Sequence, residues 1–126
     1  MLKVESPKEI AQSLTELWSP RVIGEIDDAY VKVAKIHGAL TWHKHDEEDE
    51  LFFILHGRLS IEMENGTAEL DQGDMFIVPK GVLHNPIALE PCLIMLIERK
   101  SAKHTGDVTV DGTRSVEDQL RPVSKV

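Results

Sequence analysis

The sequence contains few of the features of a secreted, membrane-spanning or nucleic-acid-binding protein. Cys92 is the only cysteine, so no disulfide can form within the chain, and its place in the apolar run Cys92–Ile97 favours a buried small side chain over a reactive thiol. Apolar runs of this length are far too short to span a membrane. Basic residues are scarce as well: 14 Lys and Arg stand against 22 Asp and Glu. The formal net charge of −8 therefore argues against nucleic acid or an anionic membrane as partner.

The rest of the composition is that of an ordinary globular domain. Hydrophobic residues make up 41% and charged residues 29% of the 126 positions, which are typical values for soluble proteins. This length suffices for one domain with its own core but not for two, so we expect a single domain over residues 1–126. The N-terminal residues have no apolar stretch of the kind found in signal peptides, and we expect a cytoplasmic location.

A helical segment is predicted over residues 6–18. Ser6 and Glu9 have the spacing of a capping box, and Pro7 suits the first helical position. The apolar residues that follow at helical spacing are Ile10, Leu14, Leu17 and Trp18. Ser19 and Pro20 end this pattern, and we interpret the apolar stripe as a packing surface.

Short strands separated by turn residues are predicted for most of the remaining chain. The predicted strands are Tyr30–Ile36, Leu51–Leu55, Leu59–Met63, Met75–Val78 and Cys92–Ile97. Asn65-Gly66, which comes after the strand Leu59–Met63, is a strong signal for a two-residue hairpin. The spacing favours an all-β antiparallel sandwich or barrel. Near the C-terminus, Ser115 and Asp118 have the spacing that caps a short helix.

The most informative stretch for function is residues 38–50, which contains two histidines and a run of acids. His43 and His45 are two residues apart, so on a strand their side chains project to the same side, where two imidazoles can bind a transition metal. A carboxylate from the run 46–50 and a third imidazole from His84 can complete such a site. Taken one at a time, a solvent-facing histidine pair, a solvated acidic loop and a turn histidine explain these residues equally well.

The joint arrangement of these residues with glycines and a proline resembles the two sequence motifs of the cupin superfamily. The first motif is a glycine, then His-x-His, a glutamate and, six residues on, a second glycine; the second motif is a glycine, five residues, Pro-x-Gly, two residues and a histidine. The matching residues are Gly38, His43, His45, Glu50, Gly57, Gly73, Pro79, Gly81 and His84. One residue fewer than usual separates Gly38 from His43, and Ala88 stands where the second motif ends in asparagine. The motif core spans residues 38–84.

The resemblance implies a fold, a metal site and its ligands. It implies an antiparallel jelly-roll β-barrel, here with an N-terminal helix and a possible short C-terminal helix. His43, His45, Glu50 and His84 would coordinate one divalent metal ion inside the barrel: iron, manganese, zinc, nickel or copper. Glu48 and Asp49 are rivals for the carboxylate, and the spacing to Gly57 favours Glu50. Glu50 would also be the candidate catalytic base if it detaches from the metal.

Two classes of function are compatible with the resemblance. The first is a metal-dependent oxygenase, isomerase, decarboxylase or lyase that acts on a small polar molecule. The second is a non-catalytic cupin that senses or stores a small ligand or a metal. Small bacterial single-domain cupins are often labelled mannose-6-phosphate isomerase-like, so a sugar-phosphate isomerase is a further alternative. We expect a homodimer, for which Trp18, Trp42 and the N-terminal helix offer apolar surface.

Overall fold

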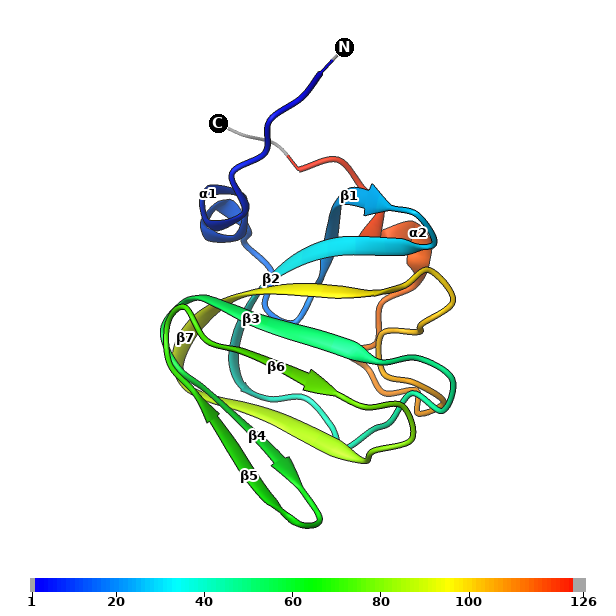
Figure 1. The fold of residues 1–126 in the computed structure, drawn as a ribbon. Coiled ribbons are helices and arrows are strands. Elements are labelled where there is room, and N and C mark those ends of the chain that lie inside the picture. The colour runs from blue at the N-terminus through cyan, green and yellow to red at the C-terminus, as the bar shows by residue number, and fades with distance from the viewer. Residues whose placement is uncertain (1, 124–126) are drawn as a thin grey trace.

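The computed structural model describes residues 2–123, which form seven strands and two short helices (Figure 1). The chain begins with helix α1 (Pro7–Ser13), and helix α2 (Val116–Gln119) lies near its end. The strands between them are β1 (Arg21–Ile26), β2 (Ala29–Ala39), β3 (Glu50–His56), β4 (Leu59–Met63), β5 (Gly66–Leu70), β6 (Met75–Val78) and β7 (His84–Arg99). All ladders between these strands are antiparallel.

The long strand β7 joins two sheets into an antiparallel jelly-roll barrel. Its second half pairs with β2 and β3, giving the strand order β1-β2-β7-β3-β6. Its first half, His84–Ile87, pairs with β4, whose other neighbour is β5, while β2 continues along the opposite edge of β7 as far as Ile87. The exposed residues Leu89, Glu90 and Pro91 lie between the two halves. The all-β jelly-roll fold predicted from the sequence is confirmed.

Apolar side chains fill the interior of the barrel. Successive side chains of a strand point to opposite faces, so every second residue of β2, β3 and β7 faces inward. The buried members of this cluster include Ala34, Ile36, Phe52, Ile54, Cys92, Ile94 and Leu96. Cys92 is fully buried, as predicted, and burial raises the pKa of its thiol to about 11.

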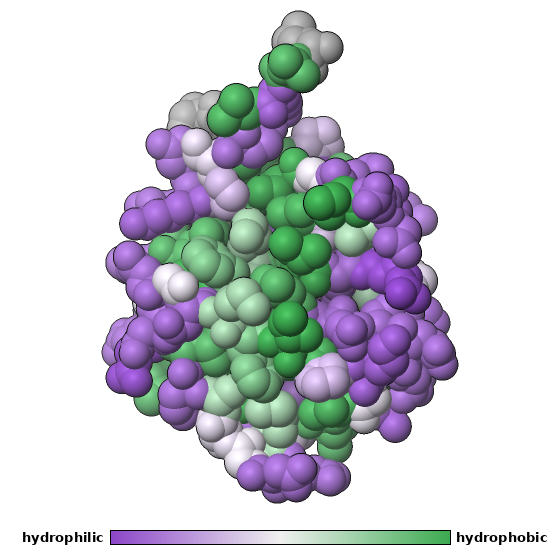
Figure 2. Space-filling model, in the orientation of Figure 1, coloured by the Kyte–Doolittle hydropathy of each residue, from purple (hydrophilic) through white to green (hydrophobic). Residues whose placement is uncertain are grey.

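The outer face of the β2-β7-β3-β6 sheet is apolar as well. Helix α1 covers part of it with Ile10 and Ala11, which pack with Leu14 against Val33 and Leu93. Figure 2 shows a band of hydrophobic side chains along this face, beyond the part that the helix covers. Met75 and Ile77 of β6 remain 56% and 45% exposed there.

The N-terminal helix is shorter than the prediction of residues 6–18. It ends at Ser13, Leu14 is extended, and the Ser6 side chain makes no capping hydrogen bond, so the predicted capping box is wrong. Leu17 instead bridges to Lys35 of β2, and Trp18 packs against the barrel interior. One helix cannot place Ile10 on the outer face of the sheet and Trp18 against its inner face, so the helix ends between them.

The five predicted strands and the predicted hairpin are present. The hairpin turn consists of Glu64 and Asn65, because Gly66 already pairs with Met63. β1, which contains Gly24, lies outside the predicted strands, and β7 begins eight residues earlier than predicted, at His84. The short C-terminal helix is confirmed, since the Ser115 hydroxyl accepts a hydrogen bond from the Asp118 amide at 3.1 Å.

Among residues 2–123, neither helix has the length and hydropathy that a membrane-spanning helix requires.

Candidate metal centre

The side chains of His43, His45, Glu50 and His84 meet inside the barrel. All four residues are buried, and each offers one donor atom within 4.8 Å of the other three donors. Two donors on opposite sides of one transition-metal ion, each about 2.1 Å from it, are about 4.2 Å apart. The limit of 4.8 Å is close to this separation. The cluster is compatible with a metal ion in both geometry and donor chemistry.

Main-chain hydrogen bonds hold His43 and His84 opposite each other. Each residue donates its amide to the carbonyl of the other, at 3.0 and 2.9 Å. Each imidazole also has Nδ1 within hydrogen-bond distance of the carbonyl two residues earlier, Thr41 at 3.0 Å and Val82 at 2.9 Å. A ring that donates from Nδ1 to a carbonyl leaves the lone pair on Nε2 free for a metal. Both rings are thus oriented before any ion binds.

The Pro79–Val82 turn fixes the segment that carries His45. Gly81 has a φ of +80°, which favours glycine, and its amide donates to the His45 carbonyl at 2.8 Å. The neighbouring Lys80 amide donates to the Asp49 carboxylate at 2.9 Å. The Pro-x-Gly part of the second motif therefore ties down both ends of the loop that leads from His45 to β3.

Glu50 is the carboxylate that faces the cluster. Its Oε1 lies 3.5 Å from Nε2 of His45 and 3.3 Å from Nε2 of His84. The rivals are engaged elsewhere: Asp49 is exposed and accepts from Lys80, and Glu48 accepts from the Ser101 hydroxyl at 2.9 Å. Glu50 is the first residue of β3, and it lies on the side of that strand that faces the barrel interior.

Charges within the cluster set the protonation of its members. Burial alone would raise the pKa of Glu50, but contacts with His45 and His84 outweigh it and lower the pKa. Burial, together with the neighbouring His84, lowers the pKa of His43 to about 4. Burial opposes protonation of His45 too, yet its contact with Glu50 prevails and raises the pKa. Near neutral pH, Glu50 and His43 are therefore deprotonated, which is the form that binds a metal. At His45, a proton competes with the metal.

A buried ion pair adjoins the cluster and was not predicted from the sequence. Lys32 Nζ lies 2.8 Å from Glu98 Oε1, with both side chains almost fully buried, and Glu98 is the register partner of Glu50 across β3 and β7. Burial and the nearby Glu50 charge raise the pKa of Glu98 to about 7, although Lys32 opposes this. Removing one partner of such a pair typically costs about 3–5 kcal/mol. Lys32 and Glu98 thus bring further charge into the barrel beside Glu50.

A cavity beside the cluster is lined mainly by apolar side chains. His43 and Glu50 face it from the cluster, and Trp18, Leu40, Phe52 and Leu96 are among its apolar residues. His104, from the segment after β7, lines it as well. No partner for His104 could be predicted from the sequence, because the position of this residue depends on how that segment folds back over the barrel.

The structure departs from the predicted local geometry in one respect. His43 and His45 are not on a regular strand: only His43 takes part in an isolated bridge. Their side chains converge all the same, because the bridge to His84 and the bond from Gly81 fix the two residues separately. Of the remaining histidines, His37 and His56 are exposed and lie outside the cluster.

Comparisons with known proteins agree with this fold. A family model described as "Cupin domain" matches residues 29–98, which is more than half of the chain. An uncharacterised Bacillus subtilis protein, YdbB, is 32% identical over 104 residues, covering 82% of this chain and 92% of the relative.

Two solved structures are similar in sequence as well as in fold. A cupin-2 domain containing protein from Shewanella frigidimarina is 40% identical, with a TM-score of 0.69, covering 71% of this chain and 87% of the other. A Neisseria meningitidis protein is 26% identical, with a TM-score of 0.71, covering 78% of this chain and all of the other. Neither description names an activity.

Proposed function

This chain belongs to the cupin domain family, and on that premise we propose that it is a metal-dependent enzyme that acts on a small polar molecule. The proposed ligands of one divalent ion (iron, manganese, zinc, nickel or copper) are His43, His45, Glu50 and His84. Glu50 is also the proposed catalytic base. The family alone does not define a reaction, so the proposal depends on the site.

The observation that carries the proposal is a set of buried polar atoms that form no hydrogen bond and lie close together. Among the described residues, Nε2 of His45, Nε2 of His84 and Oε1 of Glu50 are buried without a hydrogen bond. Each such atom typically costs about 1–3 kcal/mol. Three of them around one point are best explained by a cation that all of them bind.

The residues around the proposed ion define what the site can do. A bound divalent ion supplies Lewis-acid chemistry or, if it is iron or copper, activation of dioxygen. Three neutral imidazoles and one carboxylate leave a net charge near +1, which attracts an anionic or polarised oxygen. Glu50 lines the cavity as well as the cluster, which supports a role as base for a molecule held there when its carboxylate detaches from the ion.

The cavity lining disfavours a phosphorylated sugar as substrate. No Lys or Arg is among the residues that line the cavity beside the cluster. The acids Asp46, Glu47 and Glu48 line the neighbouring surface pocket, where Lys44 and Lys103 offset only part of their charge. A phosphate monoester carries nearly two negative charges and needs cationic partners. We therefore rank the isomerase-like alternative below an enzyme for a small, weakly charged molecule.

Metal analysis of purified variants tests the proposed ligands. We expect His43→Ala and His84→Ala to lose most bound metal, and Glu50→Gln to weaken binding at least about tenfold, because each removes one of four donors. Asp49→Asn is the matched control: it changes the neighbouring carboxylate, which faces away from the cluster, and should keep the metal. Elemental analysis after identical reconstitution gives the stoichiometry. Unchanged metal in both alanine variants, or equal effects of Glu50→Gln and Asp49→Asn, would contradict the proposal.

A second experiment separates an enzyme from a sensor or storage protein, the non-catalytic alternative. The protein is purified anaerobically, its metal is identified, and oxygen consumption is followed with a panel of small acids and phenols. Iron together with substrate-dependent oxygen uptake supports an oxygenase. A redox-inactive metal with no turnover of the panel favours a lyase, an isomerase or the binding alternative over an oxygenase.

We also propose that the protein forms a homodimer through the outer face of the β2-β7-β3-β6 sheet. From the sequence, we expected Trp18, Trp42 and the N-terminal helix to supply the apolar surface for this contact. In the structure, Trp18 packs against the barrel and α1 packs against the sheet. The exposed apolar side chains of the edge strand β6 lie beside the outward-facing residues Phe53 of β3 and Met95 of β7. A second copy offers the same apolar face and can cover this one symmetrically.

A further inference from the structure

His104 is a partly buried polar side chain that the proposed metal site does not use. It lies in the segment that follows β7 and lines the cavity that His43 and Glu50 face. It does not belong to the cluster of potential ligands among the described residues. The cavity therefore has the metal cluster on one side and an imidazole from a different part of the chain on another.

A main-chain hydrogen bond fixes the tautomer of His104. The Arg114 amide donates to Nδ1 at 2.9 Å, so Nδ1 must carry the lone pair and Nε2 the hydrogen. Burial, together with the nearby His43, lowers the pKa of His104 to about 4, which keeps the ring neutral at physiological pH. In residues 2–123, no group accepts a hydrogen bond from Nε2, and this atom is not among the fully buried ones. The ring thus holds an unused N–H donor.

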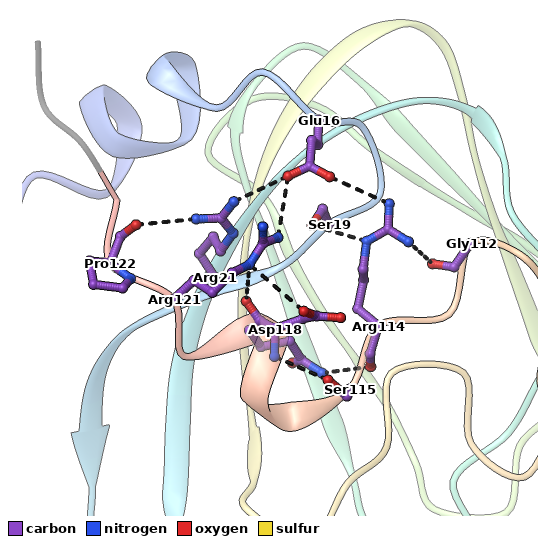
Figure 3. A network of polar contacts seen from close by, with 10 residues as sticks. Glu16, Ser19, Arg21, Gly112, Arg114, Ser115, Asp118, Arg121 and Pro122 are labelled. Carbon is purple, nitrogen blue, oxygen red and sulfur yellow. Dashed lines mark hydrogen bonds and ion pairs between the residues drawn. The ribbon is translucent and has the colours of Figure 1, made fainter.

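A polar network holds the partner of His104 in place (Figure 3). The carboxylate of Glu16 contacts the guanidinium groups of Arg21, Arg114 and Arg121 at 3.3, 3.7 and 3.2 Å. Arg114 also donates to the Ser19 hydroxyl at 3.3 Å and to the Gly112 carbonyl at 3.4 Å. One exposed ion pair contributes little, but several on one carboxylate restrain the chain segments that they join. The network therefore fixes the Arg114 amide, and with it the ring of His104.

We propose that His104 is a ligand-binding residue that donates a hydrogen bond from Nε2 to an oxygen of a small molecule in the cavity. This inference rests on the proposed metal-dependent function, because the same molecule would reach the ion held by His43, His45, Glu50 and His84. His104 cannot itself be a further metal ligand in this arrangement, since one ring nitrogen accepts from Arg114 and the other carries hydrogen.

The cavity indicates the chemical class of that molecule. Trp18, Leu40 and Phe52 offer apolar walls, and His104 offers a neutral donor in place of a cation. A centre with a net charge near +1 is neutralised by one negative charge. The cavity measures about 30 Å³, so the ligand that fits these features is a monocarboxylate about the size of acetate, bound through its oxygens to the ion and to His104.

The experiment uses the full-length protein loaded with Co²⁺, whose visible absorption changes when its coordination changes, and acetate as the probe. His104→Asn keeps an oxygen that can accept from the Arg114 amide but has no donor at the position of Nε2. His104→Gln can place an amide N–H near that position. We expect His104→Asn to retain Co²⁺ fully and to bind acetate about tenfold more weakly, which corresponds to one hydrogen bond of about 1.4 kcal/mol. His104→Gln should recover part of that affinity.

The outcomes distinguish this inference from the proposal on which it rests. His56→Asn is the control, because it makes the same change at an exposed histidine outside the cavity and should bind acetate like the unaltered protein. If His104→Asn holds Co²⁺ and binds acetate with unchanged affinity, or if acetate leaves the spectrum of the unaltered protein unchanged, the role of His104 is wrong while the metal site stands. If the unaltered protein does not retain Co²⁺, the proposed function itself fails.

Discussion

At the scale of single residues, His45 is the group whose proton competes with a metal ion. Its pKa lies above the ordinary value of 6.5, because its contact with the Glu50 carboxylate outweighs the opposing effect of burial. His43, with a pKa of about 4, and Glu50, with a lowered pKa, are both deprotonated near neutral pH. A cation that binds the four donors must therefore displace the proton of His45.

We predict that binding of one Co²⁺ ion at pH 6.5 releases roughly half to one proton from His45, because the pKa of this residue is raised above 6.5. The sign follows from the pKa values: below the raised pKa of His45 the affinity falls by about tenfold per pH unit, and above it the affinity no longer depends on this residue. Isothermal titration calorimetry in buffers of different ionisation enthalpy measures the number of protons released.

The measurement of proton release needs a control for Glu98, because the pKa of Glu98 is raised to about 7 and this residue lies beside Glu50. A cation at the cluster would also favour ionisation of Glu98 and so add to the release. The double variant Lys32→Met with Glu98→Gln removes both buried charges together, which avoids leaving one unpaired. Proton release that disappears in this variant would show that Glu98 is the source and that His45 is not.

The sequence revealed the four clustered residues but not the other polar residues around them. His43, His45, Glu50 and His84 stand in motifs whose spacing can be read directly. The signal for Lys32 was weaker. Lys32 is two residues before Ala34 and four before Ile36, so it lies on the same inward face of β2. Glu98 is two residues after Leu96 and shares the inward face of β7. His104 carried none, because its position depends on long-range contacts of the C-terminal segment.

At the scale of elements, the segment after β7 supports the loop that carries the histidines. Gly106 has a φ of +59°, and a Cβ atom added to it would lie 1.9 Å from the Lys44 carbonyl oxygen. Lys44 stands between His43 and His45. The close approach of two backbones, which only glycine permits here, therefore determines where both imidazoles stand.

We predict that Gly106→Ala weakens Co²⁺ binding at least about tenfold, because the added methyl group must displace the Lys44 carbonyl and with it the two histidines. Thermal unfolding of the metal-free variant and Co²⁺ titration of the folded variant measure the two effects. Gly73→Ala is the matched control, since Gly73 has a φ of +89° with open space around a Cβ. Both variants carry a backbone cost of about 1–3 kcal/mol. Equal Co²⁺ affinity in the two would contradict the supporting role of Gly106.

Elements were predictable where local pattern and tertiary packing agree. The alternation in β4 and the capping of α2 by Ser115 depend on neighbouring residues, and both were predicted correctly. The prediction of a helix over residues 6–18 was wrong beyond Ser13. The chain leaves the helix there, and Leu17 and Trp18 contact β2. The first half of β7 contains Pro86, which obscured the strand although it pairs with Ile61 of β4.

At the scale of the whole molecule, the barrel brings distant parts of the chain onto one centre. Glu50 begins β3, His84 begins β7, and the loop before β3 carries His43 and His45. The strand pattern alone indicated a sandwich or barrel, and the jelly-roll fold could be predicted because the two motifs resemble those of the cupin superfamily. The apolar outer face could not, because an outward-facing apolar residue looks the same in sequence whether a helix, another subunit or water covers it.

That outer face leads to a prediction about assembly. Met75 and Ile77 are 56% and 45% exposed on the edge strand β6, so a change to lysine costs a monomer little but would bury a charge in a dimer. We expect the unaltered protein to be a dimer by light scattering, and Met75→Lys with Ile77→Lys to raise the dissociation constant roughly 30-fold or more, the effect of losing about 2 kcal/mol at an interface. Val108→Lys, at a position 40% exposed in the segment after β7, is the control and should remain dimeric. If the unaltered protein is a monomer at all concentrations, water covers this face; if the lysine variant remains a dimer, the subunits meet elsewhere.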